Sequence, residues 1–145
     1  MIGVYKKGTI CLEDLIKNAR SNPEIDKAGA IVTFTGIVRS INADKIVKEL
    51  EIDSYKEMAE KVLKKIANEE KKDGIIDIQI VHLIGKFLKG EDLVYVVILG
   101  EHRKECFETL ERVINRYKSE APFWKKEILE SGKEFWIGDP INDIN

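Results

Sequence analysis

Apolar side chains recur every three to four positions in three segments, which predicts three amphipathic helices. The first covers residues 9–20, with Thr9 as its N-cap, and the second runs from Tyr55 to about Lys72. The third runs from about His102 to Lys118 and ends before Pro122, because proline cannot continue a helix. The apolar positions of the second and third helices are Met58, Ala59, Val62, Leu63, Ile66 and Ala67, and Phe107, Leu110, Val113, Ile114 and Tyr117.

Alternating or continuous apolar runs predict strands between these helices. Besides a short strand at the N-terminus, the predicted strands are residues 29–39, 46–53, 75–85, 93–100, 123–129 and 134–138, with a loop at 40–45 and a polar tail at 139–145. Gly36 lies inside one of these strands, which indicates a bulge or a close approach by another group. Short glycine-containing turns join the later strands as in antiparallel hairpins. The pattern therefore predicts an α+β fold with a mainly antiparallel sheet and three helices.

The length of 145 residues and the even composition predict a single domain over residues 1–145. Hydrophobic residues make up 43% and charged residues 34% of the chain, which is typical of a globular protein. The longest apolar run, LVYVVILG, is too short to span a bilayer, and the first residues lack a signal-peptide layout. We therefore expect a cytoplasmic protein without membrane contact. The net charge of -2 disfavours nucleic acid as a partner.

The common catalytic and metal-binding motifs are absent from the sequence. There is no phosphate loop, nucleophile elbow, dinucleotide fingerprint or paired-histidine zinc helix. Cys11 and Cys106 are far apart, and neither His82 nor His102 has a second ligand at metal spacing. We interpret both cysteines as buried bystanders and expect neither a metal nor a cofactor.

The candidate chemistry lies instead in cations at the ends of elements. His102 and Arg103 stand where a strand gives way to a helix, whose first turn offers free N–H groups and a positive dipole end. Two cations there suit a bound anion, although both could also reach solvent or pair with Glu101 or Glu105. Arg39 stands at the exit of the strand 29–39.

The stretch KSEAPFWKKE carries three further cations around a helix-to-strand corner. Lys118 ends the helix, where the dipole favours a cation even without a function. Lys125 and Lys126 are neighbours on a predicted strand, so their side chains point to opposite faces. Only one of them can share a pocket with Lys118.

Five motifs give the chain a family resemblance. GAIVTFTGIVR, LEIDSYKEMAEK, HLIGKFLKGE, EHRKECF and YKSEAPFWKKE…GKEFWI occur in the order and spacing of the large, catalytic subunit of molybdopterin synthase, the MoaE family. The match runs from about Gly29 to Ile137, and the block APFWKKE with its upstream lysine and HR pair is the most specific part. The resemblance implies a MoaE-like α/β hammerhead fold.

The resemblance also implies an enzyme of molybdenum cofactor biosynthesis. Members of the family convert cyclic pyranopterin monophosphate into molybdopterin by inserting the two sulfurs of its dithiolene. The sulfur arrives as a thiocarboxylate on the C-terminal Gly-Gly of a small ubiquitin-like partner, whose tail enters the pocket of the large subunit. The large subunits form a homodimer with one small subunit at each outer end, and no cofactor of the enzyme's own is implied.

The site residues implied by the resemblance are the cations identified above. Lys118 and Lys125 match the two active-site lysines, and the positions that match the family's substrate pocket or its border are Arg39, His102, Arg103, Lys126 and Glu127. We expect Lys125 to bind substrate and stabilise oxyanions. Lys118 is the candidate for proton transfer or for transient contact with the partner's terminal carbonyl. Glu127 could act only by orienting Lys125 or Arg39.

The alternative function from another class is a noncatalytic α+β module. Such a module would bind an acidic partner or a nucleotide through the same cations. The acidic net charge and the lack of a basic helical face argue against it.

Overall fold

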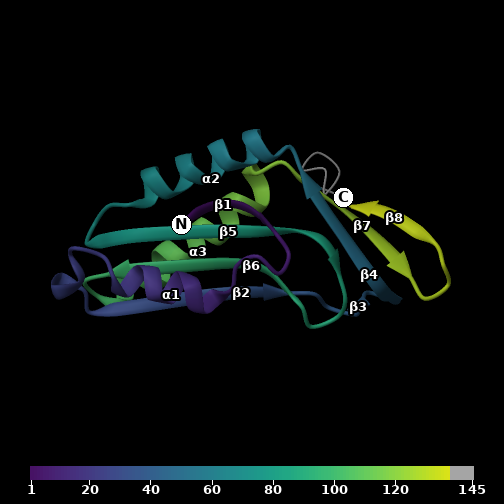
Figure 1. Ribbon diagram of the computed structural model, residues 1–145, viewed down its shortest axis with the longest axis horizontal. Coiled ribbons are helices and arrows are strands. Elements are labelled where there is room, and N and C mark those ends of the chain that lie inside the picture. The colour runs from purple at the N-terminus through teal and green to yellow at the C-terminus, as the bar shows by residue number, and fades with distance from the viewer. Residues whose placement is uncertain (138–145) are drawn as a thin grey trace.

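The computed structural model describes residues 1–137 and shows three α-helices and a mainly antiparallel sheet (Figure 1). In chain order the elements are β1 (Ile2–Lys6), α1 (Leu12–Arg20), the 3-10 turn η1 (Ile25–Lys27), β2 (Ala30–Ile37), β3 (Ile41–Asn42), β4 (Lys45–Ser54), α2 (Lys56–Glu70), β5 (Ile75–Phe87), β6 (Asp92–Gly100), α3 (Arg103–Glu120), β7 (Phe123–Leu129) and β8 (Glu134–Ile137). The α+β prediction is confirmed. The predicted tail at 139–145 and the end of the last predicted strand, Gly138, lie outside the described residues.

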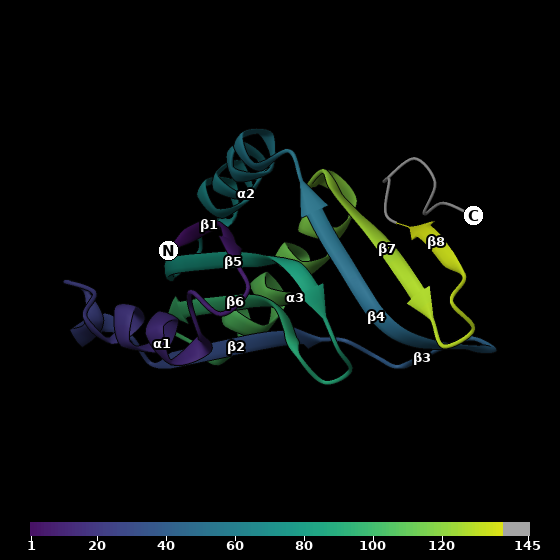
Figure 2. The ribbon, with the colours of Figure 1, turned by 45° about the vertical axis from the view of Figure 1, so that its right-hand side comes forward.

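The strands form two arms that share β5. The order across the sheet is β2-β6-β5-β4-β7-β8, with β1 parallel to β5 and β3 paired with β4. The first part of β5 lies between β6 and β1, whereas its last three residues pair with β4. Figure 2 shows the second arm, β4-β7-β8, extending away from the first at an angle.

Gly85 stands where β5 passes from one arm to the other. Its φ of 135° lies in a region that residues with a side chain rarely adopt. It pairs with Ile52 of β4, directly after the residues of β5 that pair with β1. Glycine therefore permits the bend that brings β4 and β7 next to the first arm.

The helices cover the first arm on both faces. In Figure 1, α1 lies in front of β6 and β2 and α3 lies behind them, while α2 packs against β1, β5 and α3. Residues of β5 and β6 are accordingly buried in nearly continuous runs, because each face of the arm has a cover. Phe87, at the end of β5, is fully buried where the two arms meet.

Two local details differ from the prediction for the N-terminal third. The first helix begins at Leu12 rather than at Thr9, because the Asp14 carboxylate accepts a hydrogen bond from the Cys11 backbone N–H (2.9 Å) and caps the helix there. The Thr9 hydroxyl instead donates to the Lys6 carbonyl (2.7 Å) within a turn. Cys11 is exposed, so the prediction of burial is wrong for Cys11 and right for Cys106.

Two apolar residues assigned to helix stripes are exposed. Met58 of α2 and Phe107 of α3 expose 58% and 59% of their surface. The buried side of α2 passes through Ala59, Leu63, Ile66 and Ala67, and that of α3 passes through Cys106, Thr109 and Val113. The predicted loop at 40–45 contains β3, which pairs with the start of β4. A continuous apolar stripe predicts the presence of a helix well. Which of its residues are buried depends on the elements that pack against the helix.

A cluster of ion pairs joins α2 to α3. Glu70 is buried and accepts hydrogen bonds from Arg112 (2.9 Å) and Arg116 (3.4 Å), and Arg116 also pairs with Glu69 and Glu120. Burial raises the pKa of Glu70, but the two arginines outweigh this effect and hold the pKa below its ordinary value. The ion pairs of Glu70 with the two arginines therefore contribute stability only while Glu70 is ionised.

Replacing Glu70 with Gln is expected to lower the free energy of unfolding at pH 7 by about 1–3 kcal/mol, since it removes charge-assisted hydrogen bonds. Because the pKa of Glu70 is lower in the folded chain, the contribution is complete above the ordinary pKa of about 4.3 and disappears as the pH falls through the folded value. Urea unfolding of both proteins from pH 7 to pH 3 measures this. A difference that stays constant down to pH 3 would contradict the assignment.

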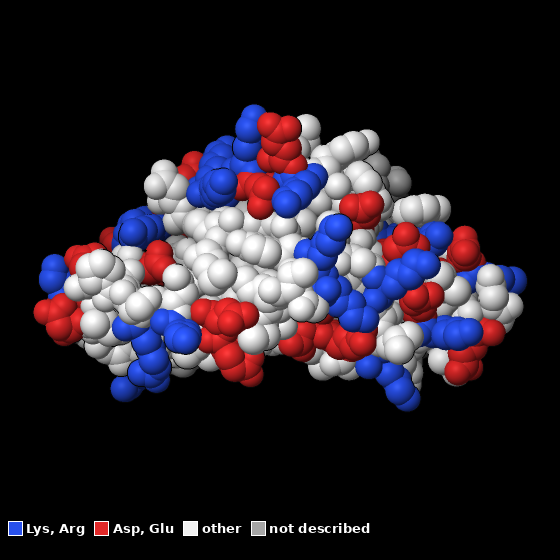
Figure 3. Space-filling view, in the orientation of Figure 1, with Lys and Arg blue, Asp and Glu red and all other residues white. Residues whose placement is uncertain are grey.

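Charges of both signs occur together on the face of the molecule drawn in Figure 3. Figure 3 shows Lys and Arg side chains alternating with Asp and Glu over the face drawn there. Among the described residues, no helix is long and apolar enough to span a membrane. The face drawn offers no continuous basic patch of the kind that nucleic-acid backbones favour.

Candidate functional site

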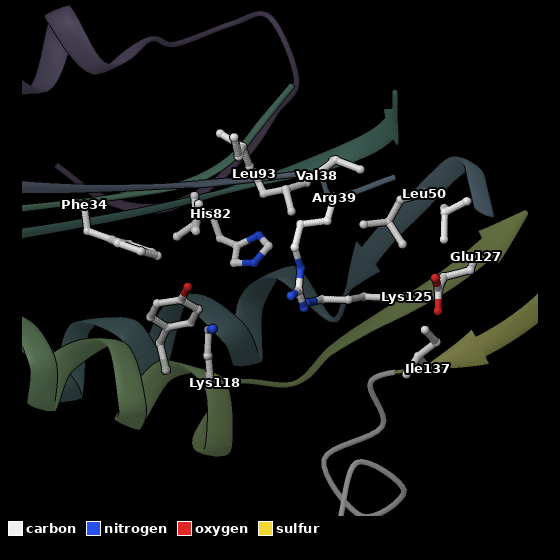
Figure 4. Close-up of a pocket in the computed structure, with 15 residues that line it drawn as sticks. Phe34, Val38, Arg39, Leu50, His82, Leu93, Lys118, Lys125, Glu127 and Ile137 are labelled. Carbon is white, nitrogen blue, oxygen red and sulfur yellow. The ribbon is translucent and has the colours of Figure 1, made fainter. Parts of the chain in front are cut away.

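A cavity of about 320 Å³ lies between the two arms of the sheet, over the C-terminal part of α3. Its walls come from β2, β4, β5, β6, α3, β7 and β8 and from the two residues after β2. The volume is within the range of small-molecule sites in proteins. Figure 4 shows Arg39, Lys118 and Lys125 reaching into this common space from three different segments of the chain.

Arg39 enters the cavity because β2 is irregular at its end. The register between β2 and β6 shifts between Gly36 and Ile37, so the simple alternation of faces stops there and both Val38 and Arg39 line the cavity. A side chain on Gly36 would also lie 2.6 Å from Val94. Both reasons foreseen for a glycine inside this strand, a bulge and a close approach, therefore apply at Gly36.

Lys118 and Lys125 meet through the corner between α3 and β7. The helix ends at Glu120, Pro122 turns the chain, and β7 begins at Phe123. Lys118 lies in the last turn of α3 and is exposed, whereas Lys125 is half-buried opposite Ile52 of β4. Both lysines line the cavity, as the sequence predicted.

The neighbours of Lys125 on β7 have different positions. Glu127, two residues on, shares the face of Lys125, lines the cavity and is 3% exposed. Lys126 lies on the other face, 3.4 Å from Glu51 and 3.7 Å from Glu134, with its ammonium 5.4 Å from the centre of the Trp136 ring. The predicted separation of Lys125 from Lys126 is confirmed, and Lys126 does not line the cavity.

His102 and Arg103 lie at the opposite end of the molecule from this cavity. His102 is the N-cap residue of α3, close to the predicted start of the helix, and with Arg103 it lines a separate open depression that also includes Gly29, Glu101 and Lys104. The preceding Gly100 pairs with Ala30 at the start of β2, whereas Arg39 follows the end of β2. Eight strand residues at about 3.3 Å each separate the two sets by roughly 25 Å. They do not converge within one chain.

The sequence reading did not assign His82 to the site, although its ring lines the cavity. His82 is on β5, is 3% exposed and stacks on Phe123 at 3.9 Å between ring centres. Burial, and secondarily the charge of Lys125, lowers its pKa to about 3, although a hydrogen bond to the Leu83 carbonyl acts in the opposite direction. The ring is therefore neutral at physiological pH. The one feature of the sequence that could have pointed to His82 as a site residue is its polar side chain on the otherwise apolar face of a buried strand.

The cavity suits an anionic ligand. Arg39 can form paired hydrogen bonds with an anion, Lys118 and Lys125 supply mobile ammonium groups, and apolar side chains such as Leu50 and Leu93 line the rest of the wall. Among residues 1–137, no cluster of three or more His, Cys, Asp or Glu side chains could hold a metal ion. The arrangement can bind a phosphate-bearing molecule and stabilise negative charge that develops beside the lysines.

Comparison with known proteins identifies relatives over most of the chain. The family model described as MoaE protein matches residues 6–120. A molybdopterin synthase catalytic subunit from Bacillus subtilis is 39% identical over 137 residues, covering 93% of this chain and 83% of the relative. A probable molybdopterin synthase from Haloferax volcanii is 39% identical over 133 residues, or 90% of this chain. The matched region is 51% of that relative, so this chain spans about half of its length.

Solved structures share the fold. Molybdopterin synthase from Staphylococcus aureus matches with a TM-score of 0.84 and 32% identity, covering 94% of this chain and 96% of that one. A chain from a protein-protein complex of subunits 1 and 2 of molybdopterin-converting factor from Helicobacter pylori matches with a TM-score of 0.73 and 25% identity. It covers 92% of this chain and 88% of the other. The matches therefore extend over both arms of the sheet.

Proposed function

Because the chain belongs to the MoaE family, we propose that it is the catalytic subunit of a molybdopterin synthase, an enzyme of molybdenum cofactor biosynthesis. The observation that carries this proposal is the convergence of Arg39, Lys118 and Lys125 on one cavity of about 320 Å³. The substrate is cyclic pyranopterin monophosphate, and the product is the dithiolene of molybdopterin. The reaction uses no metal or cofactor of the chain's own.

The sulfur donor is a small ubiquitin-like partner whose C-terminal Gly-Gly carries a thiocarboxylate. The complex of two subunits from Helicobacter pylori supports a protein partner. The thiocarboxylate sulfur attacks a carbon of the substrate and displaces an oxygen substituent, which leaves with the electron pair of the broken C–O bond. Water then cleaves the acyl C–S bond of the resulting thioester, which leaves a thiol on the pterin and a carboxylate on the partner. A second thiocarboxylated partner supplies the second sulfur in the same way. Oxyanions form in this hydrolysis, and ammonium groups beside them lower its barrier.

We assign the roles of the cavity residues from their positions. Arg39 and Lys125 bind the phosphate-bearing substrate, and Lys125 also stabilises the developing oxyanion. Lys118, on the exposed side, transfers a proton or contacts the partner's terminal carbonyl. Glu127, buried beside Lys125, orients the cations.

A homodimer accounts for the two remaining cations. His102 and Arg103 lie roughly 25 Å from Arg39 of their own chain, by the length of β2. In the homodimer, the second copy of the chain places its His102 and Arg103 at this cavity. These two residues bind the anionic groups of the substrate. With one small subunit on each outer end, the assembly is a heterotetramer.

The proposal is tested by reconstitution. The purified chain alone is expected to leave cyclic pyranopterin monophosphate unchanged, and molybdopterin is expected to form only after a thiocarboxylated small subunit is added. The control is the same small subunit with an ordinary C-terminal carboxylate, because it docks but carries no sulfur. Product is measured by fluorescence after oxidation. Product formation without the thiocarboxylate, or none with it, would contradict the proposal.

A further inference from the structure

His82 is a polar residue of the cavity to which the proposed reaction gives no role. It projects from β5 between two aromatic rings, stacked on Phe123 with a 21° angle between ring planes and edge-on to Tyr117 at 6.0 Å. Figure 4 shows the imidazole pointing into the space between Arg39 and Lys118. The ring is thus held in one orientation at the floor of the cavity.

The hydrogen bonds of His82 fix which nitrogen carries the proton. Nδ1 lies 2.9 Å from the Leu83 carbonyl oxygen, which can only accept, so Nδ1 carries the hydrogen. In a neutral ring Nε2 is then an acceptor with a free lone pair. Among the described residues, no group donates a hydrogen bond to Nε2.

Burial keeps the ring of His82 neutral, and the charge of Lys125 acts in the same direction. Lys125 faces it from β7, Lys118 from the end of α3, and Arg39 from the segment after β2, while Glu127 is the carboxylate of the same cavity. The ring is 97% buried, since its exposed fraction is 3%. With its pKa at about 3, it adds no positive charge at physiological pH and so does not repel the cations.

We propose that His82 is a specificity-determining residue that accepts, at Nε2, a hydrogen bond from an N–H or O–H group on the heterocycle of the bound substrate. The inference rests on the proposed function, because it concerns the substrate of that site. Arg39, Lys118 and Lys125 donate hydrogen bonds and so recognise the anionic part of a ligand. A donor on the heterocycle needs an acceptor, and a neutral imidazole supplies one without the charge of a second carboxylate.

The first test uses the wild-type protein. The chain has two histidines, so the ¹⁵N spectrum of the imidazole nitrogens contains the signals of two rings. The signals that disappear in the His102→Gln variant belong to His102, and those that remain belong to His82. At pH 7 we expect His82 to show a protonated Nδ1 and an unprotonated Nε2. Saturating cyclic pyranopterin monophosphate is expected to shift the Nε2 signal, and inorganic phosphate alone is not. A protonated Nε2, no shift with substrate, or an equal shift with phosphate would overturn the proposal.

The second test is kinetic. His82→Phe keeps a ring that can stack on Phe123 but removes the acceptor, so we expect KM for the substrate to rise about fivefold to tenfold, with kcat within about twofold. Phe123→Leu is the matched control, because it loosens the ring's packing but keeps the Nε2 acceptor, and it is expected to lower the unfolding temperature and to raise KM by less than His82→Phe does. An unchanged KM in His82→Phe would overturn the inference.

The two proposals fail in different ways. If the wild-type chain makes no molybdopterin with the thiocarboxylated partner, the proposed function is wrong. If the wild-type chain is active but Nε2 does not respond to substrate, only the role of His82 is wrong. The spectroscopic test decides the question even if His82→Phe does not fold.

Discussion

Alanine in place of Lys125 or Lys118 is expected to reduce molybdopterin formation by at least about a hundredfold, because each removes a cation from the reacting region of the cavity. Both side chains are at least partly exposed to the cavity or to solvent, so the unfolding temperature is expected to change little. Single-turnover assays with the thiocarboxylated small subunit measure the loss. Thermal unfolding of each variant checks the fold.

Lys126→Ala is the matched control for Lys125→Ala. It removes the same charge one residue further along β7, but from the face that carries Glu51 and Glu134. We expect it to retain most of the activity. Full turnover in both Lys118→Ala and Lys125→Ala would refute the assigned mechanism, and so would a loss in Lys126→Ala as large as that in Lys125→Ala.

Arginine substitutions separate the two lysine roles. Arginine keeps the positive charge but does not give up a proton at working pH. Lys125→Arg is therefore expected to retain part of the activity with an altered KM, since binding needs mainly charge. Lys118→Arg is expected to be nearly as inactive as Lys118→Ala if Lys118 transfers a proton.

Phe87→Ala is expected to produce the largest loss of stability. The ring is fully buried at the end of β5, where the residue pairs with Leu50 of β4, and its removal leaves a cavity at the junction of the two arms. Such a change costs about 3–5 kcal/mol, which corresponds to roughly 10 °C in the unfolding temperature of a domain of this size. Urea and thermal unfolding measure both quantities.

Phe107→Ala is the matched control, because the ring of Phe107 is 59% exposed in the single chain. We expect it to cost less than about 1 kcal/mol in the monomer. If Phe107→Ala destabilised the monomer as much as Phe87→Ala, the observed phase of α3 would be wrong. The pair thus tests the core and the corrected helix stripe together.

Those features of the site that depend only on residues close together in the sequence were predictable. Strand alternation separates Lys125 from Lys126, and a proline after a helix predicts the corner that brings Lys118 towards Lys125. The position of His102 at the start of α3 also follows from a local pattern, the change from an apolar strand to an amphipathic helix. Each of these inferences needs only a few neighbouring residues.

The parts that depend on distant pairing were not predictable in the same way. Which strand lies beside which, such as β1 parallel to β5, is not encoded in the alternation of either strand. The distance between His102 and Arg39 follows from the register of β2 with β6, so the sequence could group both as pocket residues but could not show that they lie apart. His82 was missed because a polar residue in a buried strand is often structural.

The division of the sheet into two arms has a consequence for synthesis of the chain. One edge of β4 pairs along most of its length with β7, from Ser54 opposite Phe123 to Val47 opposite Leu129, so this edge has no partner until β7 has been synthesised. The other edge of β4 pairs with β5 only over Leu50–Ile52. At about 5–20 residues per second, a ribosome leaves the first edge unpaired for on the order of ten seconds. During that interval the strand can pair with another nascent chain.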